Sequence, residues 1–264
     1  MTELTCSANT LRFADLPTRA AAAAGAGFTG IGLRLDDYRH SGHQDSRVRE
    51  LLDEHALRIL ELEHTWDWAA GEPGPEEDTL FHLADTIGYR QLNVTMFEEH
   101  PPDEVTTAFG RLCDRAADHG LLVGLEFLPY SRVRTLAQAW RVVADADRDN
   151  GGVLLDLWHW HRTGTTPADL AGIPPGRITS LQLCDVLPQP MPDAKQEARH
   201  HRQLPGQGAG GTGAVVAALR RHGLRCPVSV EVFSDELDRL PPTEAAHRAA
   251  TTGRRCLREG GWPG

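Results

Sequence analysis

Eight short apolar segments alternate with helix-like segments along the 264 residues, at a fairly even spacing. Short apolar runs bounded by turn residues are typical of buried strands, and strands that alternate with helices favour a parallel sheet. The expected strands cover residues 4–9, 30–35, 58–64, 91–97, 121–127, 153–156, 178–185 and 228–233. Because each helix returns the chain to the same end of the sheet, eight such units can close into a barrel. The sequence therefore predicts the α/β class, with a single (β/α)8 TIM barrel as one domain over residues 1–264.

Proline and glycine mark the ends of the expected helices. Pro17 falls in the first turn of one helix, where a missing N–H is tolerated, and Gly120 follows the end of another. The expected helices cover residues 16–26, 45–55, 75–87, 102–119, 136–147, 215–222 and 243–257. Residues 167–170 form only a weakly patterned element, and residues 187–211 are expected to form a long polar loop.

The composition is that of an ordinary soluble globular protein and argues against two classes of partner. Apolar residues make up 40% of the chain and charged residues 24%. The formal net charge of −10 argues against a nucleic acid partner, because binding to phosphate backbones requires a basic face. No apolar run approaches membrane-spanning length, and the N-terminus lacks the pattern of a signal peptide. We therefore expect no nucleic acid partner and no membrane association.

The cysteines indicate a reducing compartment. Their number is odd and none lies in a C-x-x-C pair, so neither a disulfide framework nor a cysteine zinc site is expected. Reduced thiols are typical of a cytoplasmic protein. The cysteines are Cys6, Cys113, Cys184, Cys226 and Cys256.

Four oxygen-bearing side chains lie at or beside the ends of four successive expected strands: Glu126, Asp156, Gln182 and Glu231. In a barrel the C-terminal ends of the strands converge on one face, so these side chains can point at one centre. Three carboxylates and an amide oxygen are hard donors that suit Mg²⁺ or Mn²⁺ better than structural zinc. Carboxylates gathered without a cation would repel one another and become partly protonated. The pattern thus predicts a divalent metal site, although any one of these residues alone would be interpreted as an ordinary solvated, salt-bridged or buried polar side chain.

The strand ends and the loop before the last strand carry one set of motifs: Glu126, Asp156-x-x-His159, Gln182-Leu183-Cys184-Asp185, Leu204-Pro205-Gly206-Gln207-Gly208 and Glu231. This set resembles the xylose-isomerase-like barrel superfamily. That superfamily includes sugar-phosphate isomerases and epimerases, ketose 3-epimerases, inosose dehydratases and 3-dehydroshikimate dehydratases. The resemblance covers nearly the whole chain. Its motifs identify the superfamily and do not identify a substrate.

The resemblance implies a role for each matching position. Glu126, Asp156, Gln182 and Glu231 would ligate the metal, His159 would contact substrate oxygens or move a proton, and Arg202 would bind a substrate oxygen. Two positions depart from a common pattern. Many ketose epimerases carry His where this chain has Gln182, whereas dehydroshikimate dehydratases carry Gln. The loop often has a glutamate at the position of Gln207.

Further aromatic and basic residues lie near the expected rim of the barrel. His64, at the end of the third strand, is a candidate for substrate contact, whereas His161 is expected to support the structure. Trp158 is a candidate wall of the pocket, since flat rings pack on the C–H faces of a sugar or cyclohexene, although packing is the alternative. Trp66, Trp68 and Trp160 share these two interpretations. The cluster 199–202 is either a solvated loop or an anion clamp, with Arg202 as its expected binding member.

The enzymatic reactions of the superfamily share the removal of a proton from the carbon next to a carbonyl. Three functions remain open for this chain. The first is an isomerase or epimerase of a keto-sugar or related polyol, dependent on Mn²⁺, Mg²⁺ or Co²⁺, with Glu126 and Glu231 as the acid and base. The second is a lyase of the 3-dehydroshikimate or inosose dehydratase type, with His159 as the base and a cyclohexene acid among its substrates. The third is a non-catalytic or DNA-repair relative; the acidic charge and the small number of histidines at strand ends disfavour the DNA-repair branch. The sequence leaves a homo-oligomer open.

Overall fold

A computed structural model describes residues 3–42, 44–71 and 73–263 and contains eight parallel strands. Each strand pairs with the next, and β8 pairs with β1 through Thr5 and Ser229, so the sheet closes into a barrel. The strands are β1 Leu4–Cys6, β2 Gly30–Arg34, β3 Arg58–Glu63, β4 Tyr89–Val94, β5 Leu122–Glu126, β6 Gly151–Asp156, β7 Ile178–Leu183 and β8 Val228–Val230. The predicted (β/α)8 barrel is confirmed.

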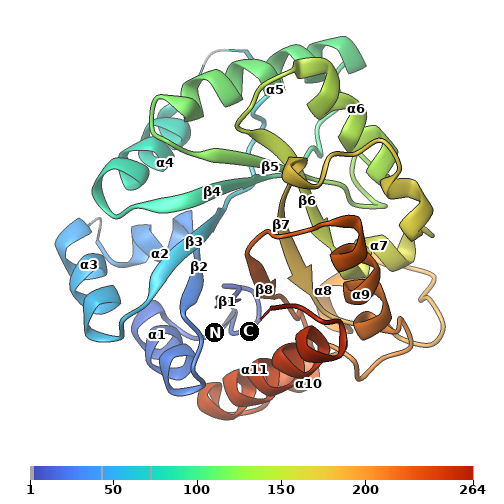
Figure 1. The fold of residues 1–264 in the computed structure, drawn as a ribbon. Coiled ribbons are helices and arrows are strands. Elements are labelled where there is room, and N and C mark those ends of the chain that lie inside the picture. The colour runs from blue at the N-terminus through green and yellow to red at the C-terminus, as the bar shows by residue number, and fades with distance from the viewer. Residues whose placement is uncertain (1–2, 43, 72, 264) are drawn as a thin grey trace.

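The helices form a ring around the strands (Figure 1). The longer ones are α1 Leu16–Gly25, α3 Asp45–Glu54, α4 Pro75–Thr86, α5 Pro102–Ala117, α6 Leu136–Ala146, α9 Thr212–His222 and α11 Pro242–Glu259. The shorter ones are α2 Leu35–His40, α7 Leu157–Arg162, α8 Ala194–His200 and α10 Asp235–Asp238, with 3-10 turns at Pro167–Leu170 and Pro175–Arg177. Each long helix turns small or apolar residues towards the strands, as the periodicity predicts. Among the described residues, no helix combines the length and apolar character needed to cross a membrane.

The expected loop at 187–211 is partly wrong, because α8 lies within it. Asp193 caps this helix: its side chain accepts hydrogen bonds from the backbone N–H groups of Lys195 and Gln196, at 2.9 and 3.0 Å. The helix has only seven residues, of which Glu197 and Ala198 are buried. So short a helix has no repeating apolar face, which is why periodicity did not predict it.

The Asp156-x-x-His159 motif forms the junction between β6 and α7. Asp156 ends the strand and caps the helix, accepting a hydrogen bond at 3.0 Å from the backbone N–H of His159. An N-cap carboxylate reaches the third residue of a helix, so this spacing has a structural purpose as well. The turn fixes Asp156 and His159 side by side at the C-terminal end of the barrel.

Gly152 in β6 lies where the barrel wall leaves no room for a side chain. A Cβ atom at this position would lie 2.7 Å from the carbonyl oxygen of Arg177 and would also overlap the methyl group of Thr179. We predict that Gly152→Ala lowers the free energy of unfolding by about 1–3 kcal/mol, because the backbone must move to relieve the overlap. Chemical denaturation measures this loss. Gly176→Ala is the matched control, since nothing lies within 4 Å of its Cβ position, and an equal loss in both variants would contradict the explanation.

Candidate active site

A cavity of about 670 Å³ opens at the C-terminal ends of the strands, where barrel enzymes hold their reacting groups. Several residues predicted from the sequence meet there, although they come from separate parts of the chain. The predicted residues that line it are His64, Glu126, His159, Gln182, Arg202 and Glu231. Asp156 is fully buried beside them, between Arg202 and the turn that carries His159.

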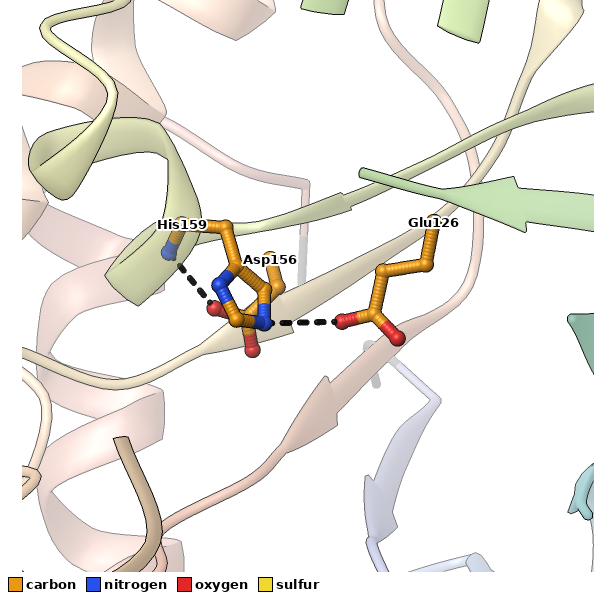
Figure 2. A group of neighbouring side chains, drawn as sticks. All are labelled: Glu126, Asp156 and His159. Atoms are coloured by element: carbon orange, nitrogen blue, oxygen red, sulfur yellow. Dashed lines mark hydrogen bonds and ion pairs between the residues drawn. The ribbon is translucent and has the colours of Figure 1, made fainter. Parts of the chain in front are cut away.

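Glu126, Asp156 and His159 form a group of side chains that could hold a metal ion (Figure 2). One ligand atom from each lies within 4.8 Å of the other two. The Nε2 atom of His159 is 3.3 Å from Oε1 of Glu126, but the geometry is not that of a hydrogen bond, so neither ring nitrogen has a partner. Burial lowers the pKa of His159 to about 4, although Asp156 opposes this effect. The imidazole is therefore neutral near pH 7 and able to accept a proton.

Arg202 is the cation at the centre of the site and is only 2% exposed. Its Nη1 donates to Oδ2 of Asp156 at 2.7 Å and to Oε2 of Glu231 at 2.9 Å, while Nε donates to the carbonyl of Ala198 at 2.9 Å. Burial opposes ionisation of Asp156, but the Arg202 charge outweighs it and lowers the pKa of Asp156. One guanidinium thus holds two carboxylates together.

The donor set contains two carboxyl groups that burial makes hard to ionise, and an unused oxygen. Burial raises the pKa of Glu126 to about 8, with Asp156 adding to the effect. Burial also raises the pKa of Glu231 to about 8, although Arg202 opposes this rise. Gln182 donates through Nε2 to Glu231 at 3.4 Å, and its buried Oε1 has no hydrogen-bond partner. Three carboxylates and this amide oxygen fit a divalent cation, whose charge would favour the ionised acids.

The raised pKa values predict a pH dependence of stability in the metal-free protein. Below about pH 4.5 both Glu126 and Glu231 are protonated in the folded and unfolded states. Between 4.5 and 8 only the folded state holds these protons, so stability falls as the pH rises through this window. Thermal denaturation at pH 5 and pH 8 in the presence of a chelator measures the fall. Glu126→Gln should flatten it, and an unchanged slope would count against the raised pKa of this carboxyl group.

Sequence reasoning assigned no role to Glu63, which ends β3 and lines the same cavity. Its Oε1 accepts a hydrogen bond from Ser7 at 3.0 Å, and Asn9 donates to its Oε2. Ser7 Oγ also lies 3.0 Å from Oε1 of Glu231, so the two carboxyl groups share the single hydroxyl proton of Ser7. Glu126 was predicted because it lies at the end of a strand. Glu63 also lies at the end of a strand, so the same signal was available in the sequence.

Two aromatic candidates have different environments. His64 lines the cavity, stacks on Trp66 with ring centroids 5.7 Å apart, and lies 3.3 Å from Oε2 of Glu76. Trp158 does not line the cavity: its side chain is fully buried, and its Nε1 donates to Glu197 at 3.3 Å. The expected contact between Trp158 and a substrate is therefore corrected to a packing role beneath Arg202, whose guanidinium lies 5.9 Å from the indole ring.

Three members of the basic cluster line the cavity, whereas the Pro-Gly loop lies outside its lining. Arg199, exposed at the end of α8, lines the mouth, and His200 pairs with Asp235 at 2.9 Å. The Pro-Gly loop is held by Asp185, which accepts hydrogen bonds from the backbone N–H groups of Gly206 at 3.1 Å and Gly210 at 2.7 Å. Gln207 is exposed and does not line the cavity. His161 also lies outside the cavity lining, in agreement with a supporting position.

The barrel and its acidic cavity define a class of protein. The family model of the xylose isomerase-like TIM barrel matches residues 20–259, and the chain belongs to this family. This membership confirms the resemblance predicted from the strand ends.

Particular relatives carry more specific names. A 3-dehydroshikimate dehydratase of Pseudomonas aeruginosa is 31% identical over 253 residues, which are 92% of this chain and 39% of that relative. An inosose isomerase of Bacillus subtilis is 34% identical over 143 residues, which are 53% of this chain and 50% of that relative. The chain thus spans half or less of the length of these curated relatives. A solved structure of the IOLI protein with a binding zinc atom shows the same fold, with a TM-score of 0.86, 22% identity and coverage of 98% of this chain and 99% of the other.

Proposed function

We propose that this protein is a divalent-metal-dependent isomerase or epimerase that abstracts a proton next to the carbonyl of a keto-sugar or related polyol. The observation that carries the proposal is the group of Glu126, Asp156 and His159, which brings a neutral imidazole against metal-type oxygen donors. Proton removal next to a carbonyl requires a base, an acid and stabilisation of charge on the carbonyl oxygen. The site offers a group for each requirement.

One ion of Mn²⁺, Mg²⁺ or Co²⁺ would be held by Glu126, Asp156, Gln182 and Glu231. The unpartnered Oε1 of Gln182 and the raised pKa values of the two glutamates support this ligand set. When bound, such an ion polarises the substrate carbonyl and stabilises the negative charge that develops on its oxygen.

The side chains of this chain would move the proton. In an epimerisation, one of Glu126 and Glu231 takes the proton from the carbon next to the carbonyl, and the other returns a proton to the opposite face of that carbon. The two carboxyl groups come from different strands and face one cavity, which gives them separate approaches to the substrate. Arg202 has no partner for Nη2 among the described residues, so this group is free to donate to a substrate oxygen. His64 lines the same cavity and would contact the substrate nearer the rim.

A lyase is the second candidate, because a relative named as a 3-dehydroshikimate dehydratase aligns over 92% of this chain. In that reaction His159 would take the proton from the carbon next to the carbonyl. The C–O bond at the β carbon then breaks, and the leaving hydroxyl departs as water after accepting a proton from an acid such as Glu126. The neutral imidazole of His159 suits the first step.

A substrate panel tests the proposal. Protein supplied with Mn²⁺ or Mg²⁺ is incubated in D₂O with ketoses, inososes and 3-dehydroshikimate, and ¹H NMR follows exchange and product formation. We expect deuterium exchange next to the carbonyl of a ketose or inosose, loss of that exchange with a chelator, and recovery on adding the metal back. Growth of an aromatic product from dehydroshikimate would instead establish the lyase. Neither exchange nor product across the whole panel would contradict both candidates.

A further inference from the structure

The wall of the cavity formed by Ser7, Asn9 and Glu63 is built around a carboxyl group to which the proposed chemistry gives no role. We call these three residues the Glu63 wall. Ser7 Oγ lies 3.0 Å from Oε1 of Glu63 and 3.0 Å from Oε1 of Glu231, and it accepts the backbone N–H of Asn9 at 3.2 Å. Asn9 Nδ2 donates to Oε2 of Glu63 and, at 3.2 Å, to Oε1 of Glu231. Two neutral side chains therefore hold the Glu63 carboxyl group beside the proposed reaction centre.

We propose that Glu63 is a further substrate-binding residue, which accepts a hydrogen bond from a substrate hydroxyl and makes the enzyme prefer a neutral polyhydroxylated ketone to a substrate that carries a carboxylate. This inference rests on the proposed function, since it names the substrate class for the same site. Three observations support the inference: Glu63 retains free acceptor positions, other carboxyl groups surround it, and the nearby arginines are already paired with acids.

Glu63 retains hydrogen-bonding capacity towards the cavity. A carboxylate offers about four acceptor positions, and Ser7 and Asn9 use two of them. The side chain is partly exposed and lines the cavity together with Asn9 and Asn93, so the remaining positions are accessible to a ligand. Among the described residues, no arginine, lysine or histidine forms an ion pair with Glu63. A carboxyl group held only by neutral partners is suited to bind hydroxyl groups.

The surroundings of Glu63 are crowded with other carboxyl groups. Burial and the carboxyl groups of Glu231 and Glu61 raise its pKa well above the ordinary value. Glu61, also on β3, is 3% exposed and is held by Asn93 at 3.1 Å. A substrate carboxylate placed against this wall would therefore face the oxygens of further carboxyl groups and no positive charge, which is an unfavourable environment for an anion.

The arginines on this side of the cavity are already engaged. Arg12 is paired with Asp235 at 2.8 Å and also with Asp238, and Arg34 is paired with Asp37 at 3.0 Å. Among the arginines that line the cavity, only Arg199 has no acidic partner within the described residues, and it is exposed on α8 at the mouth. The Glu63 wall thus offers acceptors for hydroxyl groups and no cation of its own, while Arg202, which keeps Nη2 for a substrate oxygen, is already paired with Asp156 and Glu231.

Binding of two non-reacting ligands tests the inference without relying on turnover. Isothermal titration calorimetry on protein supplied with Mn²⁺ measures the affinity for myo-inositol, a neutral polyol, and for shikimate, a hydroxylated carboxylate. In Glu63→Gln we expect myo-inositol to bind about tenfold more weakly, since the amide offers one acceptor oxygen where the carboxyl group offers two. Shikimate should bind at least as tightly as it does to the unaltered protein, since its carboxylate is not expected to use Glu63.

The control variant and the metal affinity separate substrate contact from a structural effect. Glu99→Gln removes the same charge from an exposed residue that pairs with Arg132 at 3.0 Å, and it should change neither affinity. Mn²⁺ affinity should be unchanged in Glu63→Gln; a parallel loss of metal and myo-inositol binding would show that Glu63 merely positions Glu231, and would overturn the proposal. Unchanged myo-inositol affinity would overturn it as well.

Failure of this inference is distinguishable from failure of the proposed reaction. If no carbonyl compound reacts but myo-inositol binding still depends on Glu63, the inference stands and the proposed reaction is wrong. If a neutral inosose or ketose reacts and Glu63→Gln leaves its kcat/KM unchanged, the reaction stands and the inference is wrong. Preferred turnover of 3-dehydroshikimate by the unaltered protein would also overturn the inference.

Discussion

Glu126→Gln is expected to lower kcat at least about a thousandfold, because the variant removes both a proton carrier and a proposed metal ligand. The amide keeps the size of the side chain, and the buried carboxyl group is costly to ionise. The folded state should therefore be at least as stable as the unaltered protein at pH 8 without metal. Steady-state kinetics on the substrate identified by the panel, with a thermal melt of the same sample, measures both effects.

Two further variants test whether this loss of turnover is specific to the proposed site. Glu231→Gln should lose turnover to a similar degree, since it is the second carboxyl group of the proposed acid–base pair. Glu99→Gln, at an exposed position on the same end of the barrel, should retain full activity. Activity retained in both Glu126→Gln and Glu231→Gln would show that the reaction takes place elsewhere.

Arg202→Met is expected to lower the free energy of unfolding by about 3–5 kcal/mol in the presence of a chelator, because it leaves Asp156 and Glu231 buried without their cation. Arg202 is 2% exposed and donates to both carboxylates through one nitrogen, and Asp156 is fully buried, so water cannot replace the guanidinium at that carboxylate. A divalent cation supplies the missing charge, and millimolar Mn²⁺ should recover much of the loss. Chemical denaturation with and without Mn²⁺ measures this recovery.

An exposed ion pair provides the comparison for Arg202→Met. Arg148 binds Asp114 at 2.6 Å on the surface, and Arg148→Met should destabilise the protein far less than Arg202→Met, with no response to Mn²⁺. Equal losses of stability in the two variants would contradict the assignment of Arg202 as the cation that holds the carboxylates together. So would an Arg202→Met protein whose stability does not recover when Mn²⁺ is added.

Strand positions were predictable because each depends on a local pattern. Apolar runs between turn residues placed all eight strands, with differences of a few residues at their ends, for example at β1 Leu4–Cys6. The helix α8 was missed because its seven residues have no apolar periodicity, and its start depends on the side chain of Asp193. Local patterns thus predict elements that are long enough to repeat, and miss those held by a single cap.

The candidate site was predictable in part for a similar reason. Glu126, Gln182 and Glu231 lie at or beside strand ends, and the barrel brings all such positions to one face. Glu63 has the same kind of position, but nothing local distinguishes it from a solvated glutamate. Its significance came only from Ser7 and Asn9, which follow β1 and reach it across the barrel.

The sequence by itself determined the barrel and the strand ends that face its mouth, because apolar runs between turn residues and the right-handed strand–helix–strand connection are properties of consecutive residues. Only the tertiary structure decided how those residues pair. It buried Trp158, and it placed Arg202 between Asp156 and Glu231, residues 46 and 29 positions away along the chain. Such pairings depend on the register in which the sheet closes, and burial then sets the charge of each group.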